Sequence, residues 1–172
     1  MKNAIILIVV FILSAPLPGC DSGIVSRDKI FSYVNDHYKL LENFPYHEIE
    51  DFAAMPMDYE TQLKFDDNEK EVIENYLGSK TIVKSVYAYN ENILQYTCGA
   101  SGLLDTGSSV GFYYSKNDTP FAFEFGNVQL NELRSGVFEW HDDNYNQNIH
   151  HGHKIQTEKI RDHWYYYMTV YK

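Results

Sequence analysis

The residues of this sequence best suited to binding a metal ion are histidines and aspartates between positions 141 and 153. Imidazole nitrogens and carboxylate oxygens together suit Zn²⁺, Ni²⁺ or Cu²⁺. The spacing matches no standard structural zinc motif, and ordering a loop around an ion costs conformational entropy. We therefore favour a solvated polar loop and keep metal capture as the alternative. The residues concerned are His141, Asp142, Asp143, His150, His151 and His153, with His163 beyond them.

A second group with catalytic potential is centred on Asp105. From Leu103 to Ser109, two aliphatic residues precede an Asp-Thr-Gly-Ser run, which resembles the active-site signature of pepsin-like and retroviral-type aspartic proteases. The resemblance implies that Asp105 activates a water molecule and that Thr106 and Ser108 support its carboxylate. That family needs a second copy of the motif, or a homodimer that supplies one, and this sequence has no second copy. We favour an ordinary loop and keep a hydrolase using Asp105 as the alternative.

Cys98 is the remaining candidate nucleophile. Its alternation with Leu94 and Tyr96 along an expected strand predicts a thiol that faces the core, where free cysteines are often buried. Catalysis through Cys98 is therefore not expected, and the sequence contains no complete catalytic motif. It assigns no catalytic residue, no metal ligand and no cofactor.

The first twenty residues carry the features of an export signal. Lys2 supplies a positive charge, and the run from Ala4 to Leu13 is apolar throughout. This run has the length of a signal-peptide core and is too short for a membrane span, which needs about 20 apolar residues. The alternative is an ordinary secretory signal, or a weak N-terminal anchor, that happens to contain Cys20.

Residues 17–20 resemble the lipobox of bacterial prolipoproteins. That family has a large aliphatic residue three positions before the cysteine and a small residue just before it, as Leu17 and Gly19 are here. Pro18 departs from the Ala, Ser, Thr or Val that is usual at its position. The resemblance implies cleavage between Gly19 and Cys20 and a diacylglycerol on the Cys20 thiol. Acyl chains of the palmitate type would attach the protein to the lipid bilayer without crossing it.

This interpretation divides the chain into three parts. Residues 1–19 form a lipoprotein signal peptide, residues 20–27 a lipid-anchored tether, and residues 28–172 a single α+β domain. The protein is then expected at the cell membrane of a bacterial envelope, outside the cytoplasm. With Cys20 acylated, Cys98 has no intramolecular partner, so no disulfide is expected.

Helical periodicity dominates the start of this domain. Apolar residues recur at helical spacing over residues 30–41, with Asp28 as the expected N-cap. A shorter helix is expected over residues 46–54. A third is expected over residues 66–77, closed by the left-handed residue that Gly78 can supply.

The remainder of the domain predicts an antiparallel sheet. Residues 99–109 and 141–156 are expected as loops. Because the helices precede the strands, we expect an α+β fold with two or three N-terminal helices packed on one antiparallel sheet of about five to seven strands. The β-branched and aromatic runs that predict strands are residues 81–89, 93–98, 112–114, 121–125, 128–133, 137–140 and 164–171.

Composition limits the classes of partner. A chain of 172 residues with 44% hydrophobic and 16% aromatic residues can form one ordered domain. Its net charge of -10 repels phosphates, so a nucleic-acid-binding role is not expected. The segment from Glu42 to Tyr76 contains eleven acidic and two basic residues. It is interpreted either as a solvated surface or as a docking patch for a basic protein partner.

Tyrosines and tryptophans of the expected strands form the second candidate surface. One face of the sheet should be core, and the other would be either cross-strand packing or an exposed platform for a protein or sugar. Together these features predict a membrane-anchored lipoprotein whose domain is a non-catalytic protein- or ligand-binding module. Inhibitory and immunity-type proteins belong to this class.

Overall fold

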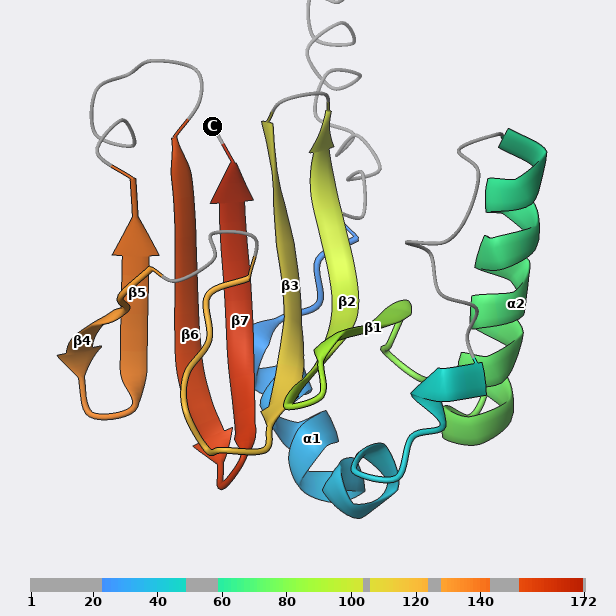
Figure 1. Cartoon of the computed structure of the whole chain (residues 1–172), viewed down its shortest axis with the longest axis horizontal. Coiled ribbons are helices and arrows are strands. Elements are labelled where there is room, and N and C mark those ends of the chain that lie inside the picture. The colour runs from blue at the N-terminus through green and yellow to red at the C-terminus, as the bar shows by residue number, and fades with distance from the viewer. Residues whose placement is uncertain (1–22, 49–58, 104–105, 124–127, 143–151, 172) are drawn as a thin grey trace, which may run out of the picture.

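The computed structural model describes residues 23–48, 59–103, 106–123, 128–142 and 152–171. The described helices precede the strands along the chain, and the fold is α+β, as the sequence predicts (Figure 1). The helices are α1 (Arg27–Leu41), the short 3-10 helix η1 (Tyr46–Glu48) and α2 (Tyr59–Leu77). The strands are β1 (Ser85–Asn90), β2 (Ile93–Leu103), β3 (Thr106–Ser115), β4 (Asn131–Arg134), β5 (Val137–His141), β6 (His153–Arg161) and β7 (Trp164–Tyr171).

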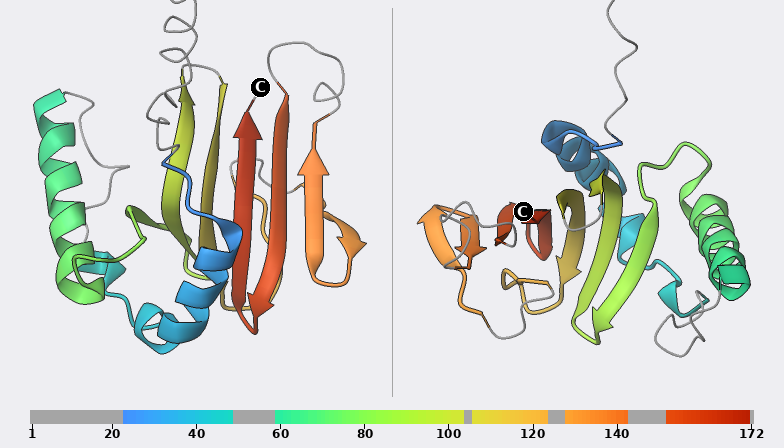
Figure 2. Two further views of the ribbon diagram at one scale, coloured as in Figure 1. Left: turned by 180° about the vertical axis from the view of Figure 1, so that it is seen from behind. Right: turned by 90° about the horizontal axis from the view of Figure 1, so that it is seen from above.

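The strands form one antiparallel sheet of seven, in the order β1-β2-β3-β7-β6-β5-β4. Strand β3 pairs with β2 on one side and with β7 on the other. The segment that follows β3 therefore cannot pair with it as a further strand. Residues 116–123 and 128–130 instead lie over the face opposite α1 and lead to β4 at the far edge (Figures 1 and 2). The sheet is therefore covered on both faces.

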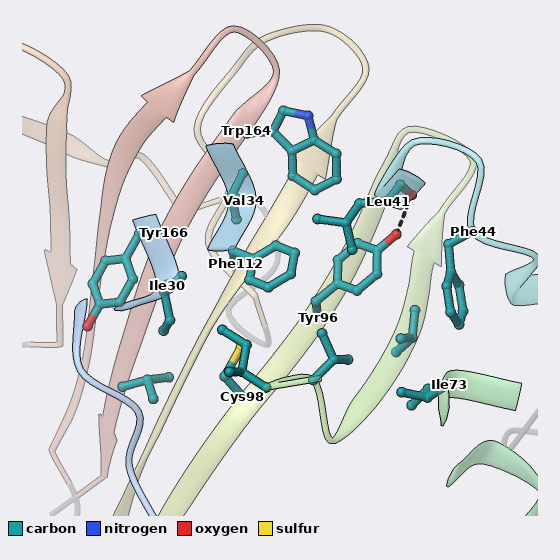
Figure 3. Packing of buried hydrophobic residues seen from close by; sticks show 14 residues of the cluster. Ile30, Val34, Leu41, Phe44, Ile73, Tyr96, Cys98, Phe112, Trp164 and Tyr166 are labelled. Carbon is teal, nitrogen blue, oxygen red and sulfur yellow. Dashed lines mark hydrogen bonds between the residues drawn. The ribbon is translucent and has the colours of Figure 1, made fainter. Parts of the chain in front are cut away.

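Helix α1 packs on one face through a stripe of apolar residues. Ile30, Val34 and Leu41 are fully buried there, in the core cluster that also contains Tyr96 and Phe112 (Figure 3). The two rings stack with centroids 4.8 Å apart. The Tyr96 hydroxyl donates to the Leu41 carbonyl oxygen at 2.7 Å, which satisfies an acceptor left open by the helix end. The end of α1 is thus fixed against β2.

Two cationic side chains hold α1 along β6. The guanidinium of Arg27 donates to both carboxylate oxygens of Glu158, at 2.7 and 2.6 Å. This hydrogen bond and the charge of Glu158 raise the pKa of Arg27 against the effect of partial burial. Towards the other end of the helix, the guanidinium of Arg161 lies 3.4 Å from the ring centre of Tyr38. These contacts fix the direction of α1 across the sheet.

The opposite face carries a second core, which is mainly aromatic. Tyr113, Tyr165 and Tyr167 come from the two central strands, and Phe123 from the covering segment. The rings of Tyr113 and Tyr165 stack at 5.2 Å, and Phe123 meets Tyr113 edge-on at 5.0 Å. Such geometries add to the stabilisation that burial of the rings provides.

Helix α2 stands beside the edge strand β1 (Figure 1). The buried carboxylate of Glu69 accepts a hydrogen bond of 2.8 Å from the backbone N–H of Val86, so one outward-facing donor of the edge is occupied. Gly78 has φ +87° and ends the helix in the left-handed conformation, as the sequence predicts.

The helix boundaries differ from the expected ones. The N-cap of α1 is Ser26 rather than the expected Asp28. Asp28 lies in the first turn, where its negative charge interacts favourably with the helix dipole. In place of the helix expected over residues 46–54, the described residues show only η1. Helix α2 begins at Tyr59, seven positions before the expected start.

Three expectations for the sheet were wrong. Residues 121–123 do not form a strand, because both neighbours of β3 are already in place. The described residues of 99–109 belong to β2 and β3 rather than to a loop. Strand β6 begins at His153, inside the expected polar loop, because its charged side chains are paired with other elements.

Candidate functional site

A groove of about 130 Å³ opens where the chain after α1 passes the turn between β1 and β2. Its lining combines buried Phe44 and Ile93 with the exposed carboxylates of Glu42 and Glu91. The ring of Tyr46, 45% exposed, also lines it. We call this the hairpin groove.

A second groove, of about 390 Å³, lies on the other side of the same segment, between residues 45–48 and α2. Pro45, Val72 and Tyr76 supply apolar surface, and Glu48 and Glu71 supply exposed carboxylates. We call this the helix groove, and the two together the linker grooves.

Local hydrogen bonds and ring contacts fix the walls of both grooves. The Tyr76 hydroxyl donates to the Asn43 carbonyl oxygen at 2.9 Å, and its ring meets that of Phe44 edge-on at 5.5 Å. In the β1–β2 turn, the side-chain oxygen of Asn90 accepts from the N–H of Asn92 at 2.8 Å. Helix α2 therefore holds one wall of the helix groove in place, and the β1–β2 turn holds one wall of the hairpin groove.

The linker grooves have a consistent negative charge. Among the residues whose side chains the structure describes, each is lined by two glutamates and by no lysine, arginine or histidine. In the part of the chain that the structure describes, the ion pairs involve other carboxylates, such as Glu139, Glu158 and Asp118. The arrangement suits a partner that brings a positive charge next to apolar surface.

The predicted aromatic surface lies on the opposite face of the sheet, at the β1 edge. Tyr87 is 48% exposed, and its ring lies 5.9 Å from that of Tyr89. Tyr89 in turn meets Phe121 at 5.1 Å. Most other rings of this face are buried in the second core, so the exposed part is narrower than the sequence suggested.

The structure brings His141, Asp142 and His153 together, and it separates them from His163. His141 ends β5 and His153 begins β6 at one end of the sheet, whereas His163 lies in the β6–β7 turn at the other. His150, His151 and Asp143 lie outside the described residues. Among the described residues, no three histidine, cysteine, aspartate or glutamate side chains are grouped as a metal site would need.

Asp105 also lies outside the described residues. Its described neighbours Leu103 and Thr106 are register partners at the ends of β2 and β3. This placement provides no argument for a protease.

Cys98 is the buried thiol that the sequence predicts. It is fully buried, and its burial raises the pKa of the thiol to about 12. Because the thiolate is the reactive form, a nucleophilic role at neutral pH is disfavoured. Leu17, Pro18, Gly19 and Cys20 lie outside the described residues.

Sequence reasoning missed two features of these sites. Glu91 joins Glu42 only because the fold brings the β1–β2 turn beside the end of α1. Asp118 has φ +52° and binds Lys159 and Tyr165, far along the chain. The positive φ of a non-glycine residue such as Asp118 is visible in the structure and was not predicted from the local sequence pattern.

Comparison with known proteins identifies no relative: no family model, no curated protein and no solved structure matches the chain. Within the described part, no helix is both long and apolar enough to cross a membrane.

Proposed function

We propose that this protein is a lipid-anchored lipoprotein, held outside the cytoplasm by acylated Cys20, whose domain is a non-catalytic protein-binding module. Its partner would present a lysine or arginine beside an apolar side chain to the linker grooves. An inhibitory or immunity-type role would fit this mode of binding. The observation that carries the proposal is the pair of grooves, whose described lining combines apolar residues with four glutamates and contains no basic residue.

The charge of the grooves supports a basic partner over an acidic or neutral one. Complementary charge accelerates association and excludes wrong partners, while desolvated apolar contacts supply affinity. Tyr46 lines the hairpin groove together with its two carboxylates and offers an amphipathic contact of the kind enriched at interfaces.

The aromatic surface is the second candidate, because Tyr87 is as exposed as Tyr46. It lies on the other face of the sheet, so variants can separate the two. A partner or sugar bound at this surface would lose affinity in Tyr87→Ala and would be indifferent to charge at the linker grooves.

Site-specific photo-crosslinking in the native envelope tests the proposal. A benzophenone amino acid at position 46 should give one discrete adduct, because this side chain lies in the hairpin groove. The same amino acid at Leu133, which is 56% exposed on β4 at the far edge, is the matched control and should give none. The adduct should weaken at high salt, since exposed charges are screened.

Charge reversal distinguishes this site from a general acidic effect. Glu42→Lys with Glu91→Lys should abolish the adduct. Asp28→Lys should leave it intact, because Asp28 lies about 20 Å away, at the other end of α1. An adduct that persists in the double variant, or that forms equally at Leu133, would exclude the linker grooves as the binding site.

A further inference from the structure

The first described residues of the chain are seated on the sheet instead of standing clear of it. Gly99 of β2 has no side chain, and a Cβ there would overlap the carbonyl oxygen of Gly23 and come within 3.1 Å of the Ile24 Cα. Val25 packs against the core beneath α1. Figure 2, seen from behind, shows this segment crossing the face of β2 on its way to α1. We call the contact with Gly99 the tether seat.

The tether seat lies near one end of the sheet. β2 runs from Ile93 to Leu103, so Gly99 is close to its C-terminal end. Tyr171 lies at the same end, since it pairs with Gly107 of β3 and with His153 of β6. The hairpin groove lies at the opposite end, beside Ile93. Six residues of extended strand separate Gly99 from Ile93, about 20 Å.

The chain between the seat and the proposed lipid is short. Cys20 precedes Gly23 by three residues, which can span at most about 11 Å. A domain whose residue 23 is seated at Gly99 therefore cannot turn this end far from the bilayer. The lipid anchor is part of the proposed function, and the present inference rests on it.

We propose that the end of the sheet that carries the tether seat faces the bilayer, so that the hairpin groove points away from it. The described residues around the seat, 23–25, 99–103 and 106–109, contain no charged side chain, whereas Asp142 and Lys154 lie at the same end of the sheet on the side of β5 and β6. The part around the seat can approach lipid headgroups without desolvating a charge. The carboxylates of the hairpin groove lie more than a Debye length of about 8 Å farther out, where an anionic membrane surface is screened.

Headgroup quenching of two matched labels tests this orientation. The lipidated, full-length protein is reconstituted in phosphatidylcholine–phosphatidylglycerol vesicles that carry a nitroxide on the lipid headgroup. A fluorophore is attached at Ala100→Cys, beside the seat, or at Lys116→Cys, seven residues beyond the register partner of Ala100 and about 23 Å away. Both positions are exposed, and the buried Cys98 does not compete for the label.

The label at position 100 should lose most of its fluorescence, and the label at position 116 should keep most of it. Equal quenching of the two labels, or stronger quenching at position 116, in protein that sediments with the vesicles would overturn the orientation but not the anchor. Protein that fails to sediment with the vesicles would instead overturn the proposed anchor.

A second variant tests the tether seat itself. Gly99→Ala adds the Cβ that overlaps Gly23, so the difference between the two labels should shrink while membrane binding persists. A folded Gly99→Ala protein with an unchanged difference would show that the seat does not orient the domain.

Discussion

At the scale of single residues, Asp118 connects the segment that covers the second core to the β6–β7 hairpin. Its carboxylate accepts from the Lys159 ammonium at 2.6 Å, from the His163 N–H at 2.8 Å and from the Tyr165 hydroxyl at 3.1 Å. Desolvation opposes ionisation of this carboxyl, but these hydrogen bonds outweigh it and lower its pKa below the usual value. Asp118 and His163 both have positive φ, which is unfavourable for residues with a side chain. The hydrogen bonds of the Asp118 carboxylate therefore stabilise two unfavourable backbone conformations.

Asp118→Asn should lower the free energy of unfolding by about 1–2 kcal/mol at pH 7, because the charge-assisted bond to Lys159 is lost while Asn tolerates positive φ. A carboxyl whose pKa is lower in the folded state stabilises the fold above its unfolded pKa of about 4, and this stabilisation is lost as pH falls through the folded value. The difference between wild type and variant should therefore shrink below about pH 4. Urea unfolding at pH 7 and pH 3 measures it.

The matched control is Asp162→Asn, because Asp162 approaches the same Lys159 at 3.2 Å but its side chain is 86% exposed. Its effect should be close to zero. Equal effects of the two variants, or a difference that does not change with pH, would contradict the role given to Asp118.

At the scale of elements, Glu69 joins α2 to the sheet edge. Its carboxylate binds the Val86 N–H at 2.8 Å, and the side chain is 8% exposed. Ile73, one turn later, is buried in the same core cluster as Val86. This pair of contacts places α2 where it can form one wall of the helix groove.

Glu69→Ala should leave the Val86 N–H without its carboxylate partner and cost about 1–3 kcal/mol of stability. Amide hydrogen exchange of the β1 peptide should become faster, since the edge strand loses its contact with α2. Glu74→Ala is the control, because the Glu74 side chain is 42% exposed and its ion pair with Lys70 is long, at 4.0 Å. Its removal should have little effect. Unchanged exchange of β1 in Glu69→Ala would contradict this account of the edge.

The elements that the sequence predicted correctly are those with a strong local pattern. The apolar stripe of α1, the helix stop at Gly78 and the aromatic run of β7 are each visible in a short window. Strand β6 is not, because three of its charged side chains are neutralised only by distant residues. These pairs are Lys154 with Glu139, Glu158 with Arg27, and Lys159 with Asp118.

The sequence predicted the candidate site only in part. The acidic segment that begins at Glu42 does contribute carboxylates to both linker grooves. The contribution of Glu91 could not be predicted, because it depends on the packing of a strand turn against the end of α1. The aromatic pattern of residues 121–125 was misleading for the opposite reason: in its described part, residues 121–123, the side chains pack on the sheet although the backbone does not pair with it.

At the scale of the whole molecule, the tether seat and the hairpin groove lie at opposite ends of the sheet and differ in charge. Around the tether seat the described residues are uncharged, and at the far end the hairpin groove carries Glu42 and Glu91. With the signal removed, the proposed mature chain has 153 residues and keeps one free thiol, the buried Cys98. An anchored domain of this kind would present its acidic groove to partners outside the membrane.

The lipid on Cys20 is the claim on which the anchor, the orientation and the proposed function all depend. Intact-mass spectrometry of the protein purified from membranes tests it most directly. We predict a chain that begins at Cys20 and carries a diacylglycerol, and a Cys20→Ala variant that remains as the uncleaved precursor of 172 residues. A mature chain without lipid, or a Cys20→Ala variant that is cleaved and membrane-bound like the wild type, would contradict the account.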